Sequence, residues 1–87
     1  MRYKVEHLET VIRKDISGLA KTARRQIKRA IEQRLTSNPI EIGKPLRYSL
    51  KGARRLRVGN YRVTYKIEPP NTVLIVKIGH RKEVYED

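Results

Sequence analysis

The chain has 87 residues, of which 21 are Lys or Arg and 9 are Asp or Glu, and its formal net charge is +12. This length supports one modest hydrophobic core, so we expect residues 1–87 to form a single domain. Cysteine is absent and the histidines are His7 and His80, which excludes a disulfide framework, a thiolate metal site and a cysteine nucleophile. We therefore expect no metal and no other cofactor.

The excess of basic residues is larger than solubility requires and predicts binding to nucleic acid or another polyanion. No apolar run approaches the ~20 residues that cross a bilayer, and residues 1–6 lack the apolar stretch of a secretory signal. A cytoplasmic protein without a membrane partner is the resulting prediction.

The N-terminal half predicts one strand followed by two helices. Residues 3–7 alternate apolar and polar side chains, as a short strand does. From Leu8 apolar residues recur at helical spacing, and after Gly18 the same spacing continues through residues 21–35. Pro39 ends the second helix because the residue before proline disfavours the α conformation. The basic residues on the outer side of this helix predict mainly a solvated face.

Residues 40–52 predict an irregular connection, since they contain Gly43, Pro45 and Gly52. Leu46 and Leu50 are its expected apolar anchors. The length of this segment suits a functional loop, whose lysines are expected to approach a substrate.

The C-terminal half predicts three strands joined by two turns, at Gly59-Asn60 and at residues 69–71. In the first two strands, Arg55, Arg57 and Arg62 alternate with apolar residues, which predicts one buried and one basic face. In the third strand, parity puts Leu74, Val76 and Ile78 on one side and Val73, Ile75 and Lys77 on the other.

The expected fold is therefore α+β: an N-terminal strand, a two-helix hairpin and a three-stranded antiparallel meander. The helices are expected to cover the sheet face that carries Leu74, Val76 and Ile78. Val73 and Ile75 are expected to form an apolar strip beside the arginines, where a partner helix could bind.

The motifs GKPLRYSLKGARRLRVGNYRVTY at residues 43–65 and GHRKEVY at residues 79–85 resemble the RelE/ParE toxin superfamily of bacterial and archaeal toxin–antitoxin pairs. The likeness spans nearly the whole chain, and its most specific parts are LRVGNYR at residues 56–62 and GHRKEVY at residues 79–85. It implies a RelE-like microbial ribonuclease-type fold. It also implies a toxin that enters the ribosomal A site and cuts mRNA there without metal, until a cognate RelB-like antitoxin silences it.

The resemblance also implies the site residues. Arg62, Arg81 and Tyr85 match the arginines and the terminal tyrosine that RelE-like nucleases use in catalysis. The first meander strand departs from the pattern, because Ala53, Arg55 and Arg57 stand where those nucleases carry lysines. The residues expected to bind the substrate are Lys51, Arg54, Arg55, Arg57, Lys77, His80 and Lys82.

These residue types suit RNA cleavage, which requires a transition state of high negative charge to be neutralised. Arg62 and Arg81 are assigned that role because guanidinium donates to two phosphate oxygens at once. Arginine is always protonated and cannot act as the base, so Lys51 and His80 are the available substitutes for the missing lysine. Tyr85 is expected to transfer a proton or to stack on a base. Histidine is a common acid or base, but the parity of His80 sets it opposite Arg81.

Two other functions fit the same basic strands. One is a ParE-like toxin that binds DNA gyrase and has no ribonuclease activity. The other is a basic RNA-binding module without catalysis. The presence of Arg62, Arg81 and Tyr85 favours the nuclease, whereas the missing strand lysine keeps both alternatives open.

Overall fold

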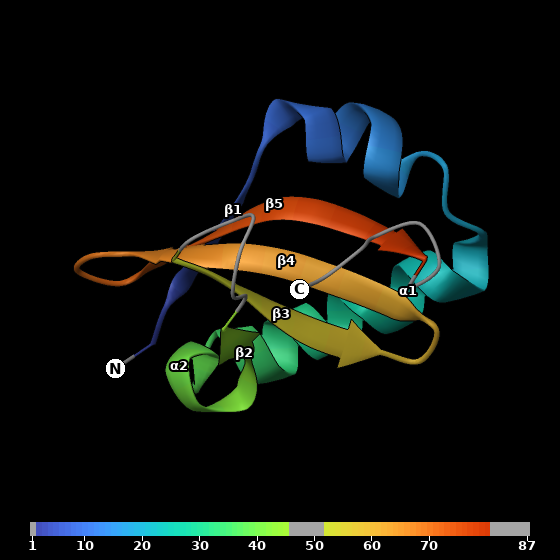
Figure 1. Ribbon diagram of the computed structural model, residues 1–87. Coiled ribbons are helices and arrows are strands. Elements are labelled where there is room, and N and C mark those ends of the chain that lie inside the picture. The colour runs from blue at the N-terminus through green and yellow to red at the C-terminus, as the bar shows by residue number, and fades with distance from the viewer. Residues whose placement is uncertain (1, 46–51, 81–87) are drawn as a thin grey trace.

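The computed structural model describes residues 2–45 and 52–80. The described elements, in chain order, are β1 (Lys4–His7), η1 (Val11–Ile16), α1 (Lys21–Ala30), η2 (Ile31–Leu35), α2 (Pro39–Ile42), β2 (Lys44–Pro45), β3 (Ala53–Val58), β4 (Tyr61–Glu68) and β5 (Thr72–His80). The strands form one sheet in the order β1-β5-β4-β3-β2. In Figure 1, α1 and its continuation η2 cross behind this sheet, while η1 lies beyond the β5 side.

The helix predicted over residues 21–35 is confirmed as one continuous segment, α1 followed by the π-type turn η2. The backbone N–H of Ile31, at the junction, still donates to carbonyls of the preceding turn. Its buried stripe consists of Ala23, Ile27, Ile31 and Leu35. This spacing places all four on the side that faces the sheet, so the helix packs through that stripe and leaves its basic side exposed.

The N-terminal helical turn η1 is attached to the sheet by a side chain as well as by packing. β1 pairs with β5 only as far as Ile75, so the edge of β5 beyond that residue has no neighbouring strand there. Asp15 on η1 supplies an acceptor at this edge. Its Oδ2 accepts a hydrogen bond of 2.9 Å from the backbone N–H of Ile78. Its Oδ1 lies 3.9 Å from Nζ of Lys77. Val11 of η1 is fully buried in the core.

The antiparallel meander is also confirmed. β3 pairs with β4 across a turn at Gly59, whose φ of +59° lies in the left-handed region that favours glycine. β4 then pairs with β5, and the prolines at 69 and 70 lie in the turn between them. β1 joins the other side of β5 in parallel, and the α+β fold is confirmed.

Two elements differ from the sequence-based expectation of an irregular connection over residues 40–52. Part of that segment forms the short helix α2, which begins at Pro39, a residue suited to a first helical position because it lacks an N–H. The next two residues form β2, whose Lys44 pairs with Arg55. β2 thus covers only the first part of β3. Leu46 and Leu50, the expected anchors, lie outside the described residues.

A β-bulge in β5 corrects the predicted sides of its apolar residues. Thr64 pairs with Lys77, but the next residue, Tyr65, pairs with Ile75, so Val76 is an extra residue. Strict alternation therefore fails at this point, and Ile75 and Ile78 lie on the same side. Both belong to the core with Val73, and each is at most 3% exposed. The expectation that Val73 and Ile75 lie beside the arginines and await a partner is wrong.

In the part of the chain that the structure describes, no helix has the length and apolar character needed to span a bilayer.

Candidate functional site

The face of the sheet turned away from α1 is basic, as predicted. Cross-strand partners share a face, so the register fixes its composition. Arg57 on β3 lies directly opposite Arg62 on β4. In the next row, Arg55 on β3, Thr64 on β4 and Lys77 on β5 follow one another across three strands. We call Arg55, Arg57, Arg62, Lys66 and Lys77 the basic face.

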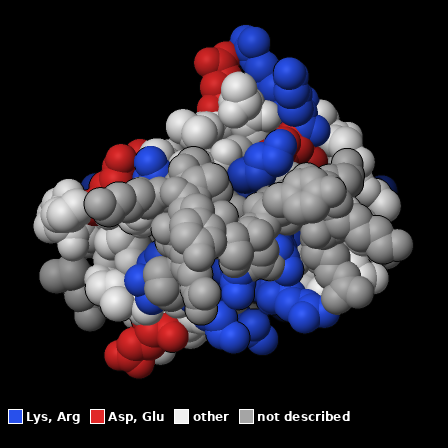
Figure 2. Space-filling model, viewed as in Figure 1, with Lys and Arg blue, Asp and Glu red and all other residues white. Residues whose placement is uncertain are grey.

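The pairing of the strands sets the distances between the charged side chains of the basic face. Directly opposed residues of antiparallel strands have Cβ atoms ~5 Å apart, and like charges in such positions destabilise the sheet. Opposed guanidinium groups at this spacing can donate together to one anionic ligand. Thr64, between Arg55 and Lys77, is 2% exposed, so the middle of this row is packed rather than hollow. Figure 2 views the sheet from this side: Lys and Arg side chains gather over its lower part, while Asp and Glu lie at the margins.

Arg54, one of the residues expected to bind the substrate, does not belong to the basic face. Its register partner is Tyr65, a fully buried core residue, so Arg54 lies on the helix side of β3. Its guanidinium donates hydrogen bonds to the backbone carbonyls of Ile40 and Gly43, the latter at 2.8 Å. Arg54 thereby attaches the α2 segment to the sheet, on the opposite side from Arg55.

Tyr65 completes this attachment. Its hydroxyl donates a 2.5 Å hydrogen bond to the carbonyl of Pro39, at the start of α2. Burial raises the pKa of Tyr65 even though Arg54 lies beside the ring and favours phenolate. The phenol is therefore protonated at neutral pH and acts as a donor.

His80 also lies apart from the basic face. It pairs with Tyr61, and the two rings meet edge to face with centroids 5.6 Å apart and planes at 76°. Tyr61 and Val63 lie on the helix side, so His80 does as well. His80, expected from the sequence to bind the substrate, is therefore not on the same face as Arg62. Lys51, Arg81, Lys82 and Tyr85 lie outside the described residues.

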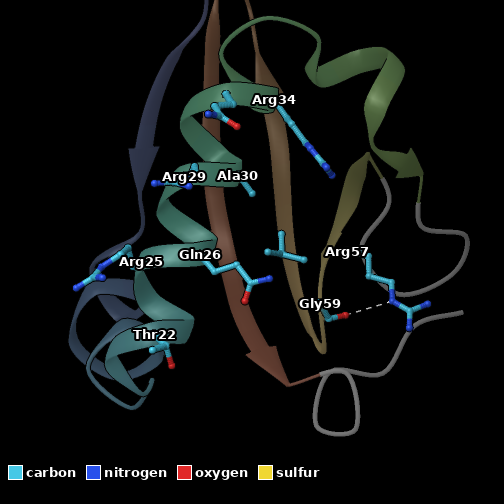
Figure 3. Close-up of a pocket in the computed structure, with 10 residues that line it drawn as sticks. Thr22, Arg25, Gln26, Arg29, Ala30, Arg34, Arg57 and Gly59 are labelled. Carbon is cyan, nitrogen blue, oxygen red and sulfur yellow. Dashed lines mark hydrogen bonds between the residues drawn. The ribbon is translucent and has the colours of Figure 1, made fainter.

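A cleft on the helix side was not anticipated from the sequence. It has a volume of about 570 Å³ and lies between the α1–η2 helix and the β3–β4 turn. Arg25, Arg29 and Arg34 line it from the helix, and Arg57 lines it from β3. In Figure 3, Arg34 and Gln26 extend from the helix toward the strands, and Arg57 lies beyond Gly59. We call these four arginines and the space between them the arginine cleft.

A second hollow differs in chemistry from the arginine cleft. This apolar groove, of about 450 Å³, lies between η1, α1 and β1 and is lined mainly by Val5, Ile16, Leu19, Ile27 and Ile31. His7, Arg24 and Lys28 also line it. Burial lowers the pKa of His7, which is therefore neutral at pH 7. Among residues 2–45 and 52–80, no three His, Asp or Glu side chains converge as a metal site would require.

Comparison with known proteins identifies the family. Residues 8–85 match the model of the ParE toxin of type II toxin–antitoxin systems, parDE. The chain belongs to this toxin family. The resemblance drawn from residues 43–65 and 79–85 is thereby confirmed at the level of the RelE/ParE superfamily.

Curated relatives of this type II toxin carry RelE-type names. It is 40% identical to Toxin RelG and 42% identical to Toxin RelE of Mycobacterium tuberculosis, in each case over 52 residues, which is 59% of this chain. The matched segment spans 60% and 54% of those two relatives.

Solved structures extend the likeness to the whole fold. The crystal structure of the toxin–antitoxin complex RelBE2 from M. tuberculosis contains a chain with 32% identity and a TM-score of 0.85, matched over 93% of both chains. The RelB–RelE complex of Methanococcus jannaschii gives 26% identity and a TM-score of 0.71, over 92% of this chain and 94% of that one. The intact E. coli RelBE complex gives 22% identity and a TM-score of 0.72, over 90% and 95%, and supports the fold alone.

Proposed function

We propose that this toxin is a metal-independent endoribonuclease that cuts mRNA in the ribosomal A site and thereby inhibits translation. The observation that carries the proposal is the basic face, and above all the direct opposition of Arg57 and Arg62 across two strands. Two guanidinium groups at this spacing bind adjacent oxygens of one phosphate or two neighbouring phosphates. The site of action would be the cytoplasm, where ribosomes translate.

Within this proposal the residues of the basic face have different roles. Arg62, on the central strand β4, stabilises the negative charge that develops on the scissile phosphate. Arg55 and Arg57 hold the backbone on either side from β3, and Lys77 holds it from β5. Arg81 and Tyr85, named from the sequence, would supply a further positive charge and the proton transfer or base stacking.

We further propose that a cognate RelB-like antitoxin silences the toxin. Relatives of this chain were crystallised as RelBE complexes, which supports an antitoxin partner. The apolar groove suits the centre of such a contact, because stable protein interfaces have an apolar middle and a polar rim. Arg24 and Lys28 at this groove would pair with carboxylates of an acidic antitoxin helix.

A ParE-like activity is the second candidate, and the match to the parDE family model favours it. In that case the toxin binds DNA gyrase, cuts no RNA and uses the basic face only for binding. A basic module that binds RNA without cutting it is the third candidate, since the arginines of the basic face alone suit that role too.

The experiment that separates these functions is in-vitro translation with primer-extension mapping of the mRNA, run beside a gyrase supercoiling assay with the same toxin preparation. The proposal predicts cuts within the codon in the A site, absent when ribosomes are omitted, and unchanged supercoiling. Inhibited supercoiling with intact mRNA would contradict it and favour the ParE-like function. Intact mRNA with unchanged supercoiling would leave RNA binding alone.

A further inference from the structure

The arginine cleft is separate from the basic face in all but one residue. Arg25, Arg29 and Arg34 belong to the helix layer, behind the sheet. Arg57 stands at the edge of β3 and belongs to both surfaces, so basic side chains continue from one surface to the other around this edge. Beyond Arg55, β3 is not covered by β2, which keeps this edge accessible among the described residues.

We propose that the arginine cleft is a second RNA site, which binds the sugar–phosphate backbone of a double-helical RNA segment. The proposal rests on the proposed function in taking RNA as the target. The basic face then takes the strand to be cut, while the arginine cleft holds a neighbouring RNA helix and orients the toxin on it.

The charge of α1 supports a ligand at this place. Arg25 and Arg29 lie one helical turn apart, and such like-charged pairs at i and i+4 destabilise a helix by ~0.2–0.5 kcal/mol each. α1 contains no acidic residue, and Glu32, in the first turn of η2, lines the apolar groove and not this cleft. Among the described residues that line the arginine cleft, none is Asp or Glu. RNA phosphates would offset this repulsion.

The lining favours RNA over a protein partner. Apart from the arginines, the cleft presents Thr22, Gln26 and Gln33, with Ala30 and Val58 as its apolar members. Arginine, threonine and glutamine are typical donors to phosphate and sugar. A protein contact of stable affinity requires an apolar centre, which the apolar groove has and this cleft lacks.

The lining also favours helical RNA over a single strand. Proteins that bind single strands stack bases on aromatic rings, and no described residue that lines the cleft is aromatic. Double-helical RNA is bound through phosphates and 2′-hydroxyls. The arginines supply donors to phosphate, and the amide oxygens of Gln26 and Gln33 supply acceptors for a hydroxyl.

Two double variants of the cleft and one matched double control test this site. Arg29→Gln with Arg34→Gln removes two positive charges from the cleft, and both side chains are exposed. The matched control, Arg2→Gln with Lys4→Gln, removes two positive charges at β1, on the opposite edge of the sheet. Arg29→Lys with Arg34→Lys keeps the charge and removes the guanidinium fork. Circular dichroism with thermal unfolding checks that every variant is folded.

The probes are a labelled RNA duplex of about 16 base pairs and a single strand of the same length, titrated at several salt concentrations. We expect the Arg29→Gln/Arg34→Gln variant to bind the duplex at least about tenfold more weakly than the control, with a salt dependence lower by about 2 in slope. We expect a smaller loss for the lysine variant, with an unchanged slope.

Three results would contradict the proposed RNA site. They are an equal loss of duplex affinity in the glutamine variant and the control, no loss of affinity at all, or the same loss of affinity for the single strand and the duplex. Polyglutamate is tested as a third probe. If the glutamine variant lost affinity for polyglutamate alone, the cleft would be assigned to an acidic protein instead. Duplex binding requires no cleavage, so this test stands apart from the proposed function. A toxin that binds the duplex through the cleft but cuts no mRNA refutes the proposed function alone.

Discussion

At the scale of single residues, neighbouring arginines on β3 lie on opposite sides of the sheet and make different contacts. Arg54 is held by two carbonyls of the α2 segment, on the helix side of the sheet. Arg55 and Arg57 lie on the basic face. The alternation of a strand is enough to separate them, because consecutive side chains point to opposite sides. A run of basic residues is therefore not a single functional unit.

Arg55 tests the departure from the RelE-like pattern. Lysine at this position restores a group whose pKa neighbouring cations lower toward the range useful for acid–base catalysis. We expect Arg55→Lys to cut mRNA at an equal or higher rate in the translation assay. A strong loss, with folding and ribosome binding unchanged, would show that the site depends on guanidinium geometry at this position.

Gly43 tests the attachment of α2. A Cβ at this position would lie 1.7 Å from the hydroxyl oxygen of Tyr65, so the buried ring must move and its hydrogen bond to Pro39 weakens. Overpacking of a core costs ~1–3 kcal/mol, and we expect Gly43→Ala to lower the free energy of unfolding by at least ~2 kcal/mol in urea titrations.

Gly52→Ala is the control for the Gly43 substitution. Its φ of +87° is strained for alanine, but nothing lies within 4 Å of the added methyl group. We expect a loss of ~1 kcal/mol, due to backbone strain alone. Equal losses at the two glycines would show that the close approach of Tyr65 has no energetic consequence.

His7 predicts a pH dependence of stability. Burial lowers its pKa in the folded state below the unfolded value, so the unfolded chain binds more protons between the two values. Its stabilising contribution is complete above the unfolded pKa, ~6.5, and is lost as the pH falls through that value toward the lower folded pKa. We expect wild-type toxin to lose more stability between pH 7.5 and 5.5 than His7→Gln does, in paired urea titrations. Parallel pH profiles would contradict the assignment to His7.

At the scale of elements, the β5 strand shows how a helix and a sheet edge are joined. The strand alternates until Val76 with Val73 and Ile75 on the core side, and the bulge puts Ile78 on that side as well. Beyond Ile75 the free edge is no longer paired with β1, and the side chain of Asp15 replaces a strand as acceptor. The position of η1 thus depends on one carboxylate in addition to the packing of Val11.

Asp15 is testable at this scale. Asp15→Ala leaves the Ile78 N–H without its acceptor, at a cost of ~1–3 kcal/mol, whereas Asp15→Asn keeps an acceptor oxygen and is expected to lose less. Native-state hydrogen exchange should show faster exchange at the Ile78 amide in the alanine variant. Unchanged protection of that amide would show that packing alone holds η1 against β5.

At the scale of the whole molecule, the sequence was sufficient for the helices, the meander and the basic face, because each leaves a local period in the chain. The long helix at 21–35 and the alternation of Arg55, Arg57 and Arg62 are such signals. The sides of Val73 and Ile75 were not predictable, because a single extra residue at the bulge leaves no mark in the pattern.

The arginine cleft was not predictable for a different reason. It is formed by residues more than twenty positions apart, on the helix and on β3. The basic residues of the helix, taken alone, predicted mainly a solvated face. Only the packing of α1 against the sheet brings Arg34 and Arg57 to one cleft. The available signal was that both the helix and β3 carry exposed basic residues. This signal does not show how the two elements lie relative to each other.

The central claim is that the basic face cuts mRNA, and Arg62→Ala tests it most directly. Arg13→Ala is the matched control, because Arg13 lies on η1, is not part of the basic face, and pairs with exposed Glu9 at 2.7 Å. The assay is A-site cleavage mapped by primer extension, with co-sedimentation to verify ribosome binding. We predict that Arg62→Ala lowers cleavage at least ~100-fold, equivalent to ~2.7 kcal/mol of transition-state stabilisation, while Arg13→Ala cuts like wild type. Wild-type cleavage by folded, ribosome-bound Arg62→Ala would contradict the account.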